Sequence, residues 1–144
     1  MGGFFMAQWI PWMTAYEVNV AEIDEQHREL FRWFNELMDA VWDGKGKDAI
    51  KDVLASTANY AVAHFATEER YMQQYGFPGY IAHKKLHDDF TADVVKFVQK
   101  YEREGATTEV IVSVVSGLGD WTRDHIRATD QELGKFLVSA LQGK

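Results

Sequence analysis

The chain has 144 residues, a formal net charge of −7, five histidines and no cysteine. This length corresponds to one domain, and a hydrophobic fraction of 47% is enough to form a core. The lack of cysteine excludes disulfides, iron–sulfur clusters, thiolate zinc sites and thiol nucleophiles. The negative charge argues against a nucleic-acid partner, which would require a surplus of Lys and Arg. A metal or catalytic site must therefore use histidine, carboxylate and hydroxyl groups.

Residues 1–18 show no helical period, and we expect them to form an arm. Exposure of Trp9, Trp12 and Tyr16 would be costly, so the arm should pack across the rest of the domain. It lacks the basic start and long apolar run of a signal peptide. No stretch of the chain reaches the roughly 18 consecutive apolar residues of a membrane span. We therefore expect a cytoplasmic protein without a membrane partner.

Four long segments follow the arm, and glycine-containing breaks separate them. The segments span about 20–42, 47–75, 80–104 and 108–141. In each, apolar residues recur every three or four positions, which is the period of an amphipathic helix. We expect Asp24 to cap the first helix and Thr107 or Thr108 to cap the fourth. Short loops between four such helices predict an all-α, up-down-up-down antiparallel four-helix bundle within a single domain, 1–144.

All five histidines fall on or beside the apolar stripes, where a buried polar group needs a partner. One histidine at such a position is usually an ordinary core residue, but five in one small core indicate a shared role. His64 and Glu68 are four residues apart, so both lie on one helix face within reach of one metal ion. His83 and His87 have the same spacing, and His27 offers a ligand from the first helix.

The fourth helix offers His125 and, five residues later, Asp130. At about 100° per residue, an ideal helix places these two side chains about 140° apart. They can share a face only if the helix is irregular between them. We therefore expect a bulge or overwound turn there, of the single-turn π type that is common at functional sites.

Five imidazoles and two carboxylates are too many ligands for one metal ion, so they indicate two ions. Nitrogen and oxygen donors without sulfur suit iron, manganese, zinc or copper. Two six-coordinate ions need about twelve donor contacts, and the seven side chains with one bridging solvent oxygen supply about eleven. One position is left for a small ligand. Glu69, next to Glu68, is expected to be exposed to solvent, as is usual for a helical glutamate.

Taken together, these motifs resemble the bacterial hemerythrins, a family of non-haem di-iron four-helix bundles that bind oxygen. The resemblance covers roughly Trp12 to Leu141. The matching motifs are Ile23-Asp24-Glu25-Gln26-His27, His64-Phe65 with Glu68-Glu69 and Met72, Phe77-Pro78, His83 and His87 with Phe90, and Trp121 with His125 and Asp130. All seven ligands that the family pattern requires are present and in order.

The resemblance implies reversible O₂ binding at two non-haem iron ions, for carriage, storage or sensing. The seven implied iron ligands are His27, His64, Glu68, His83, His87, His125 and Asp130. Glu68, Asp130 and a solvent oxide or hydroxide would bridge the two ions. The three histidines of the third and fourth helices would saturate one ion. The histidines of the first and second helices would leave the other ion an open position for O₂.

Bound O₂ needs a dry pocket, because water and protons promote loss of the ligand and leave ferric iron. The candidates for the pocket wall are Phe31, Phe65, Met72, Trp121, Thr122 and Ile126. Ordinary core packing explains most of these positions equally well. Thr122 departs from the family pattern, which commonly has leucine there. Its hydroxyl would enter the pocket unless the helix turns it outward.

The same centre could instead belong to a redox enzyme that reduces nitric oxide or peroxide, or to an iron store. The oxygen-binding reading is favoured because imidazoles outnumber carboxylates five to two, whereas oxygen-activating di-iron bundles use mostly carboxylates. On this reading the protein is not an enzyme and has no catalytic residues. Azide and nitric oxide are further possible ligands, and a monomer is expected.

Overall fold

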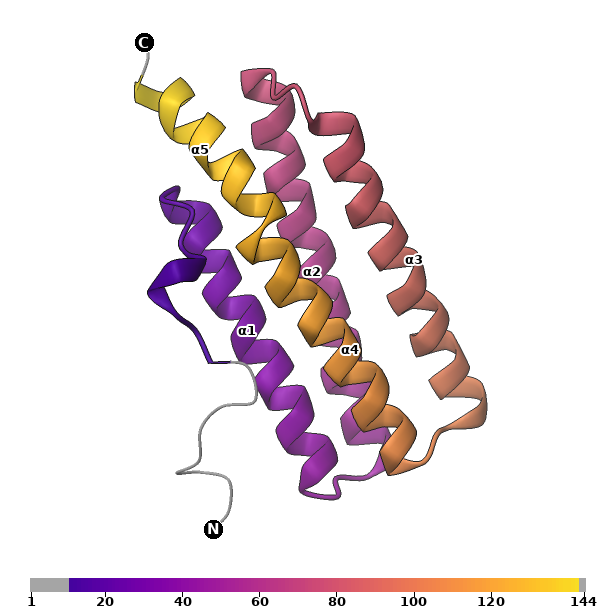
Figure 1. Cartoon of the computed structure of the whole chain (residues 1–144). Coiled ribbons are helices and arrows are strands. Elements are labelled where there is room, and N and C mark those ends of the chain that lie inside the picture. Colours follow the sequence, from indigo (N-terminus) through magenta and orange to yellow (C-terminus); the bar gives the residue numbers. More distant parts are fainter. Residues whose placement is uncertain (1–10, 143–144) are drawn as a thin grey trace.

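The computed structural model describes residues 11–142, and this part of the chain is helical without any strand (Figure 1). A short 3₁₀ helix, Thr14–Tyr16, precedes the main elements. The α-helices are α1 (Ala21–Trp42), α2 (Lys47–Tyr75), α3 (Tyr80–Glu104), α4 (Thr108–Arg127) and α5 (Thr129–Gln142). α1, α2, α3 and the α4–α5 pair run alternately up and down, so the prediction of an all-α antiparallel four-helix bundle is confirmed.

The helix ends have local causes. Gly76 ends α2 in the left-handed conformation, with φ at 69°, which only glycine adopts readily. Thr107 caps α4, as predicted, because its side chain accepts a hydrogen bond from the backbone N–H of Val110. The predicted Asp24 cap was wrong. α1 begins at Ala21, so Asp24 lies in its first turn.

Asp24 instead holds the end of the arm. Its carboxylate accepts hydrogen bonds from the backbone N–H of Val18 at 2.7 Å and of Asn19 at 3.0 Å. Asn19 has a positive φ of 68° and turns the chain into α1. The carboxylate therefore satisfies N–H groups that lie before the helix rather than at its first turn.

The fourth helical segment is interrupted where an irregularity was predicted. α4 ends at Arg127 and α5 begins at Thr129, and Ala128 between them has φ −115° and ψ −66°. The predicted π form was wrong, since none of residues 11–142 is π-helical. The break absorbs the one residue by which the spacing of His125 and Asp130 exceeds a regular helical turn. In Figure 1, α5 continues along the edge of the bundle that α4 begins.

The core contains two large apolar clusters. The α4 cluster joins α1, α2, α3 and α4, and its buried members include Leu37, Leu54, Phe90 and Val115. The α5 cluster joins the arm, α1, α2 and α5. Its buried members are Val18, Val20, Ile23, Met72, Leu133 and Leu137.

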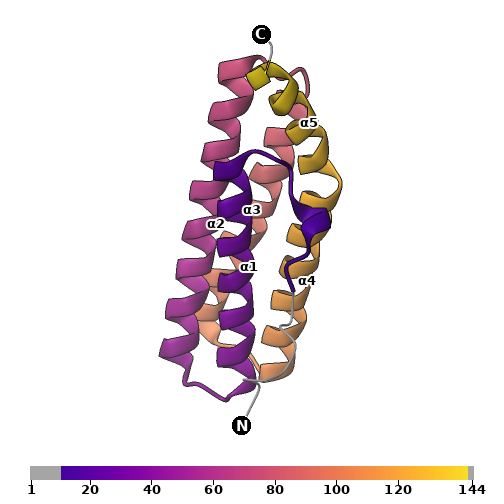
Figure 2. The same ribbon diagram turned by 90° about the vertical axis from the view of Figure 1, so that its left-hand side faces the viewer.

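The arm packs against the bundle between α1 and the α4–α5 pair, as Figure 2 shows. The ring of Trp12 lies 5.5 Å from that of Tyr16 and 5.3 Å from that of Phe31, between centroids. The guanidinium of Arg28 lies over Trp12. The predicted packing is thus confirmed for Trp12 and Tyr16, whereas Trp9 lies outside the described residues. Within the described part of the chain, no helix is long and apolar enough to cross a membrane.

Candidate metal centre

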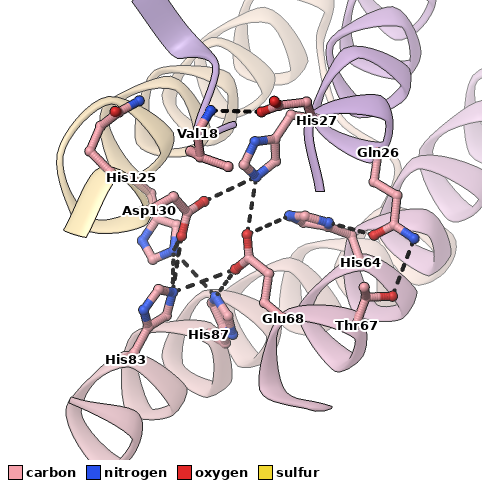
Figure 3. A network of polar contacts seen from close by, with 12 residues as sticks. Val18, Gln26, His27, His64, Thr67, Glu68, His83, His87, His125 and Asp130 are labelled. Atoms are coloured by element: carbon pink, nitrogen blue, oxygen red, sulfur yellow. Dashed lines mark hydrogen bonds and ion pairs between the residues drawn. The ribbon is translucent and has the colours of Figure 1, made fainter. Parts of the chain in front are cut away.

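Two groups of buried side chains place metal-ligating atoms within 4.8 Å of one another (Figure 3). The larger group consists of Glu68, His83, His87, His125 and Asp130. The smaller group consists of His27, His64, Glu68 and Asp130. The structure therefore brings together all seven side chains that the sequence singled out as ligands. Both carboxylates belong to both groups.

Every α-helix of the bundle contributes to these groups. α1 supplies His27, α2 supplies His64 and Glu68, and α3 supplies the pair of histidines four residues apart. α4 supplies His125 near its end, and α5 supplies Asp130 in its first turn. The break at Ala128 brings the last two side chains together, with 3.2 Å between His125 Nε2 and Asp130 Oδ1.

The two oxygens of Glu68 face different groups. Oε2 lies 3.1 Å from the Nε2 atoms of both His27 and His64. Oε1 lies 3.1 Å from His87 Nε2 and 3.5 Å from His83 Nε2. This carboxylate is fully buried and therefore reaches both groups at once.

Asp130 divides its oxygens in the same way. Oδ2 lies 3.1 Å from His27 Nε2. Oδ1 lies 3.0 Å from His83 Nε2 and 3.2 Å from His125 Nε2. Two carboxylates that each span the same two sets of imidazoles are the arrangement expected of bridging ligands.

The donor set fits a pair of metal ions. Glu68 Oε1 and both carboxylate oxygens of Asp130 are buried without a hydrogen-bond partner. Such atoms are costly to bury unless something satisfies them. In the larger group, His125 Nε2 lies 3.2 Å from the Nε2 atoms of both His83 and His87. Converging imidazole nitrogens beside unpartnered carboxylate oxygens are explained by cations between them.

The carboxylates also control protonation of the imidazoles. Burial disfavours charge on His27, but the adjacent carboxylates of Asp130 and Glu68 outweigh burial and raise its pKa to about 9. The same two groups raise the pKa of His83 to about 9. At His64 burial prevails and lowers the pKa. Although burial opposes their charge, the surrounding imidazoles hold the pKa values of Glu68 and Asp130 below the usual range.

Two imidazoles have outer partners that sequence reasoning missed. Gln26 Oε1 lies 2.8 Å from His64 Nδ1, and Glu69 Oε2 lies 3.0 Å from His87 Nδ1. Glu69 is 19% exposed, so the expectation that it faces solvent was wrong. The only signal in the sequence was adjacency, because each of these residues neighbours an expected ligand. The contact from Gln26 to His64 joins two helices, and helical spacing does not predict it.

Two of the candidate pocket residues lie directly against imidazole rings. Phe65 stacks on His87 with 4.0 Å between centroids and 8° between planes. Trp121 stacks on His125 at 4.6 Å and 11°. These contacts restrict the rotation of both imidazoles.

The other four candidates are buried farther along the helices. Met72 belongs to the α5 cluster, and Phe31 and Ile126 pack with the arm. Thr122 is 3% exposed, and its hydroxyl donates to the backbone carbonyl of Leu118 at 2.9 Å. The helix therefore does not turn Thr122 outward.

Comparison with known proteins identifies similar chains. Residues 18–137 match the Hemerythrin HHE cation binding domain family. The bacteriohemerythrin of Clostridium acetobutylicum is 31% identical over 127 residues, which cover 84% of this chain and 95% of that protein. A hemerythrin from Sipunculus nudus is 32% identical over 119 residues, covering 83% and 86% of the two chains. The crystal structure of a wild-type hemerythrin aligns with a TM-score of 0.79 at 29% identity, covering 90% of this chain and 98% of that one.

Proposed function

This chain belongs to the hemerythrin family, and on that basis we propose that it binds O₂ reversibly at a centre of two non-haem iron ions. The observation that carries the proposal is the sharing of two buried carboxylates between two groups of imidazoles. An oxygen-binding protein of this kind serves carriage, storage or sensing. Iron ions held in both groups would supply the reversible chemistry, and the chain would supply the donors and their surroundings.

The proposed ligand set has seven members. They are His27, His64, Glu68, His83, His87, His125 and Asp130. Glu68 and Asp130 would bridge the ions together with a solvent oxide or hydroxide. The support for bridging is that opposite oxygens of each carboxylate face opposite groups. The larger group has three imidazoles and the smaller group has two, so the ion in the smaller group would have the open position.

We propose that the chain's role around the centre is to orient donors and to keep water out. The rings of Phe65 and Trp121 hold the planes of two imidazoles by stacking. The apolar wall we propose consists of Phe31, Phe65, Met72, Trp121, Thr122 and Ile126. Met72 and Ile126 are 0% and 1% exposed, which supports a dry environment on their side of the centre.

We favour a binding protein over an enzyme because nearly all of the buried imidazole and carboxyl groups belong to the proposed metal ligands. Among residues 11–142, every buried imidazole or carboxyl except Asp24 belongs to the proposed ligand set. Asp24 is held by two backbone N–H groups. No buried imidazole or carboxyl in this part of the chain is thus left to act as a separate general acid or base.

Finer features of the function are also proposals. Azide and nitric oxide fit an open position that accepts a small ligand. One chain supplies both groups of donors, so the centre needs no second copy, and a monomer stays a prediction from the sequence. A cytoplasmic location stays a prediction from the sequence.

The decisive experiment is an anaerobic-to-aerobic optical titration of the iron-loaded protein with iron measured per chain. We expect two iron ions per chain and a charge-transfer band that appears with O₂ and disappears on deoxygenation. Repeated turnover of nitric oxide or peroxide with an electron donor would instead indicate a redox enzyme. Full iron occupancy without any optical response to O₂ would indicate an iron store.

A single ligand variant tests the assignment within the centre. His27→Ala should impair one iron position and abolish O₂ binding, because only the smaller group loses an imidazole. Circular dichroism should show that the bundle remains folded. Retained O₂ binding in this variant would contradict the proposed ligand set.

A further inference from the structure

The His64 ring ends a chain of hydrogen bonds that crosses between α1 and α2 (Figure 3). His64 Nδ1 lies 2.8 Å from Gln26 Oε1, and Gln26 Nε2 donates to Thr67 Oγ1 at 3.2 Å. Thr67 Oγ1 in turn donates to the backbone carbonyl of Ala63 at 3.3 Å. Each of these side chains is thereby held by a named partner.

The donors and acceptors in this series of hydrogen bonds can be assigned in only one way. A threonine hydroxyl has one hydrogen, and here it is given to a carbonyl, so Thr67 Oγ1 accepts from the amide group of Gln26. This contact turns the amide nitrogen toward Thr67 and the amide oxygen toward His64. An amide oxygen only accepts hydrogen bonds, so Nδ1 of His64 must carry the ring hydrogen.

This assignment of donors and acceptors decides which ring nitrogen of His64 can bind metal. A metal-binding imidazole is neutral and has one N–H group, and the other nitrogen has the lone pair. With the hydrogen on Nδ1, the lone pair of His64 lies on Nε2. This atom lies 3.1 Å from Glu68 Oε2, inside the smaller group of donors.

The larger group has a different outer partner. There, His87 Nδ1 lies 3.0 Å from a carboxylate oxygen of Glu69. Lys84 Nζ lies 3.9 Å from the other oxygen of that carboxylate. A carboxylate makes an imidazole a more basic ligand, whereas an amide oxygen orients it without adding charge. The two halves of the centre therefore differ in the charge behind one of their imidazoles.

We propose that Gln26 and Thr67 act as a pair of positioning residues, the Gln26–Thr67 relay. The relay fixes His64 with its hydrogen on Nδ1 and its lone pair on Nε2. It does so without bringing a negative charge to the group that has the open position. Extra charge there would stabilise ferric iron at the position that must remain reduced to bind O₂. The inference rests on the proposed metal centre.

Four variants separate the parts of the relay. Gln26→Leu removes the acceptor, and Gln26→Glu keeps an acceptor but adds a charge. Thr67→Val removes the hydroxyl at nearly constant shape, and Thr67→Ser restores it. Gln99→Leu changes an exposed glutamine of α3 and is the matched control. Thermal unfolding of each variant verifies that it is folded.

The first measurement is ¹⁵N NMR of the histidine rings in the metal-free and zinc-loaded proteins, which are both diamagnetic. We expect the hydrogen of His64 on Nδ1 in the wild type, in Thr67→Ser and in the control. In metal-free Gln26→Leu we expect a mixture of tautomers. Thr67→Val should lie between these cases, because the amide of Gln26 is then free to flip.

The second measurement is zinc release, followed for the two positions separately. Gln26→Leu should weaken binding at one position on the order of 10- to 100-fold and leave the other unchanged. Gln26→Glu should retain zinc at both positions but lower the reduction potential of the iron-loaded protein.

Two results would overturn the inference. One is a wild-type His64 ring with its hydrogen on Nε2. The other is a folded Gln26→Leu variant with wild-type tautomer and wild-type zinc release. Failure of the wild type to bind O₂ would contradict the proposed function only, because the tautomer is measured without iron or O₂.

Discussion

At the scale of single residues, Thr122 places a hydroxyl in the core three positions before His125. The hydroxyl donates to the carbonyl of Leu118, so the helix itself satisfies its hydrogen. The oxygen retains lone pairs that can accept a hydrogen bond from water. A polar atom in an otherwise apolar wall would shorten the lifetime of the oxygenated protein.

We therefore predict that Thr122→Val slows autoxidation of the oxygenated iron protein by up to about tenfold, which corresponds to about 1.4 kcal/mol in the barrier. Valine removes the hydroxyl at nearly constant shape. Thr122→Leu adds volume as well and separates the effect of polarity from that of space. The measurement is the decay of the O₂-dependent absorption band. Unchanged decay in both variants would remove Thr122 from the pocket.

The raised pKa values of His27 and His83 predict that metal binding releases protons. Without metal both are about 9, so both imidazoles are protonated at pH 7, whereas a metal ligand must be neutral. We expect about two protons to be released per chain at pH 7 and few above pH 9. Calorimetric zinc titrations in buffers of different ionisation enthalpy measure this number. Release of fewer than about one proton at pH 7 would contradict the assignment.

The raised pKa values of His27 and His83 also make the stability of the metal-free fold depend on pH. Rising pH promotes metal binding but lowers this stability. A histidine whose pKa is raised on folding stabilises the folded state fully below its unfolded pKa of about 6.5. That contribution is lost as the pH rises toward 9. Alkaline pH should thus favour metal binding and, through these two histidines, weaken the metal-free bundle.

At the scale of helices, Gly134 of α5 allows the arm to approach closely. A Cβ atom at this position would lie 2.6 Å from Val18 Cβ and 2.7 Å from the carbonyl oxygen of Val18. Val18 cannot retreat freely, since its N–H group is bound to Asp24. The contact therefore depends on the missing side chain.

We predict that Gly134→Ala lowers the free energy of unfolding by about 1–3 kcal/mol, because it overpacks this contact. Gly117→Ala is the matched control. Apart from its chain neighbours and the backbone of its own helix, no atom lies within 4 Å of a Cβ placed at Gly117, in α4. Alanine there should raise the free energy of unfolding by about 0.5–1 kcal/mol through helix propensity. Denaturant unfolding of the zinc-loaded proteins measures the free energy of unfolding of both variants. Equal changes in the two variants would show that the close approach of Val18 does not prevent a side chain at position 134.

Helical spacing explains which parts of this architecture could be predicted from sequence. The apolar stripes predicted the bundle, because a helix that buries one face has apolar residues at every third or fourth position, and this pattern is visible within one segment of the sequence. The five-residue spacing of His125 and Asp130 predicted an irregular turn. It did not predict the break at Ala128, because several distortions absorb one extra residue. The contact from Gln26 to His64 depends on how α1 and α2 are rotated against each other, and no spacing within one helix contains that information.

At the scale of the whole molecule, the metal centre separates the two apolar clusters. Along α1, His27 lies between Ile23 of the α5 cluster and Leu30 of the α4 cluster. Along α2, Glu68 likewise lies between Met72 of the α5 cluster and Phe65 of the α4 cluster. The polar layer thus interrupts the apolar core, and metal ions would connect its two parts.

We predict that metal removal destabilises the fold, by about 2.7–4.1 kcal/mol when free metal is 100–1,000 times its dissociation constant. The loss should be uneven, because the α5 cluster has fewer buried residues than the α4 cluster. Amide hydrogen exchange should therefore rise most in α5 and in the first turn of α1. A uniform rise along the chain would contradict this separation into two parts.

The sharing of Glu68 and Asp130 between both groups also affects how the centre can evolve. A mutation of either carboxylate damages both halves at once. Loss of His27 and His64 together would still leave the larger group with all five of its donors. A related protein could therefore lose one of its two metal ions through mutation of the imidazoles of α1 and α2. Mutation of a shared carboxylate would not leave one intact position.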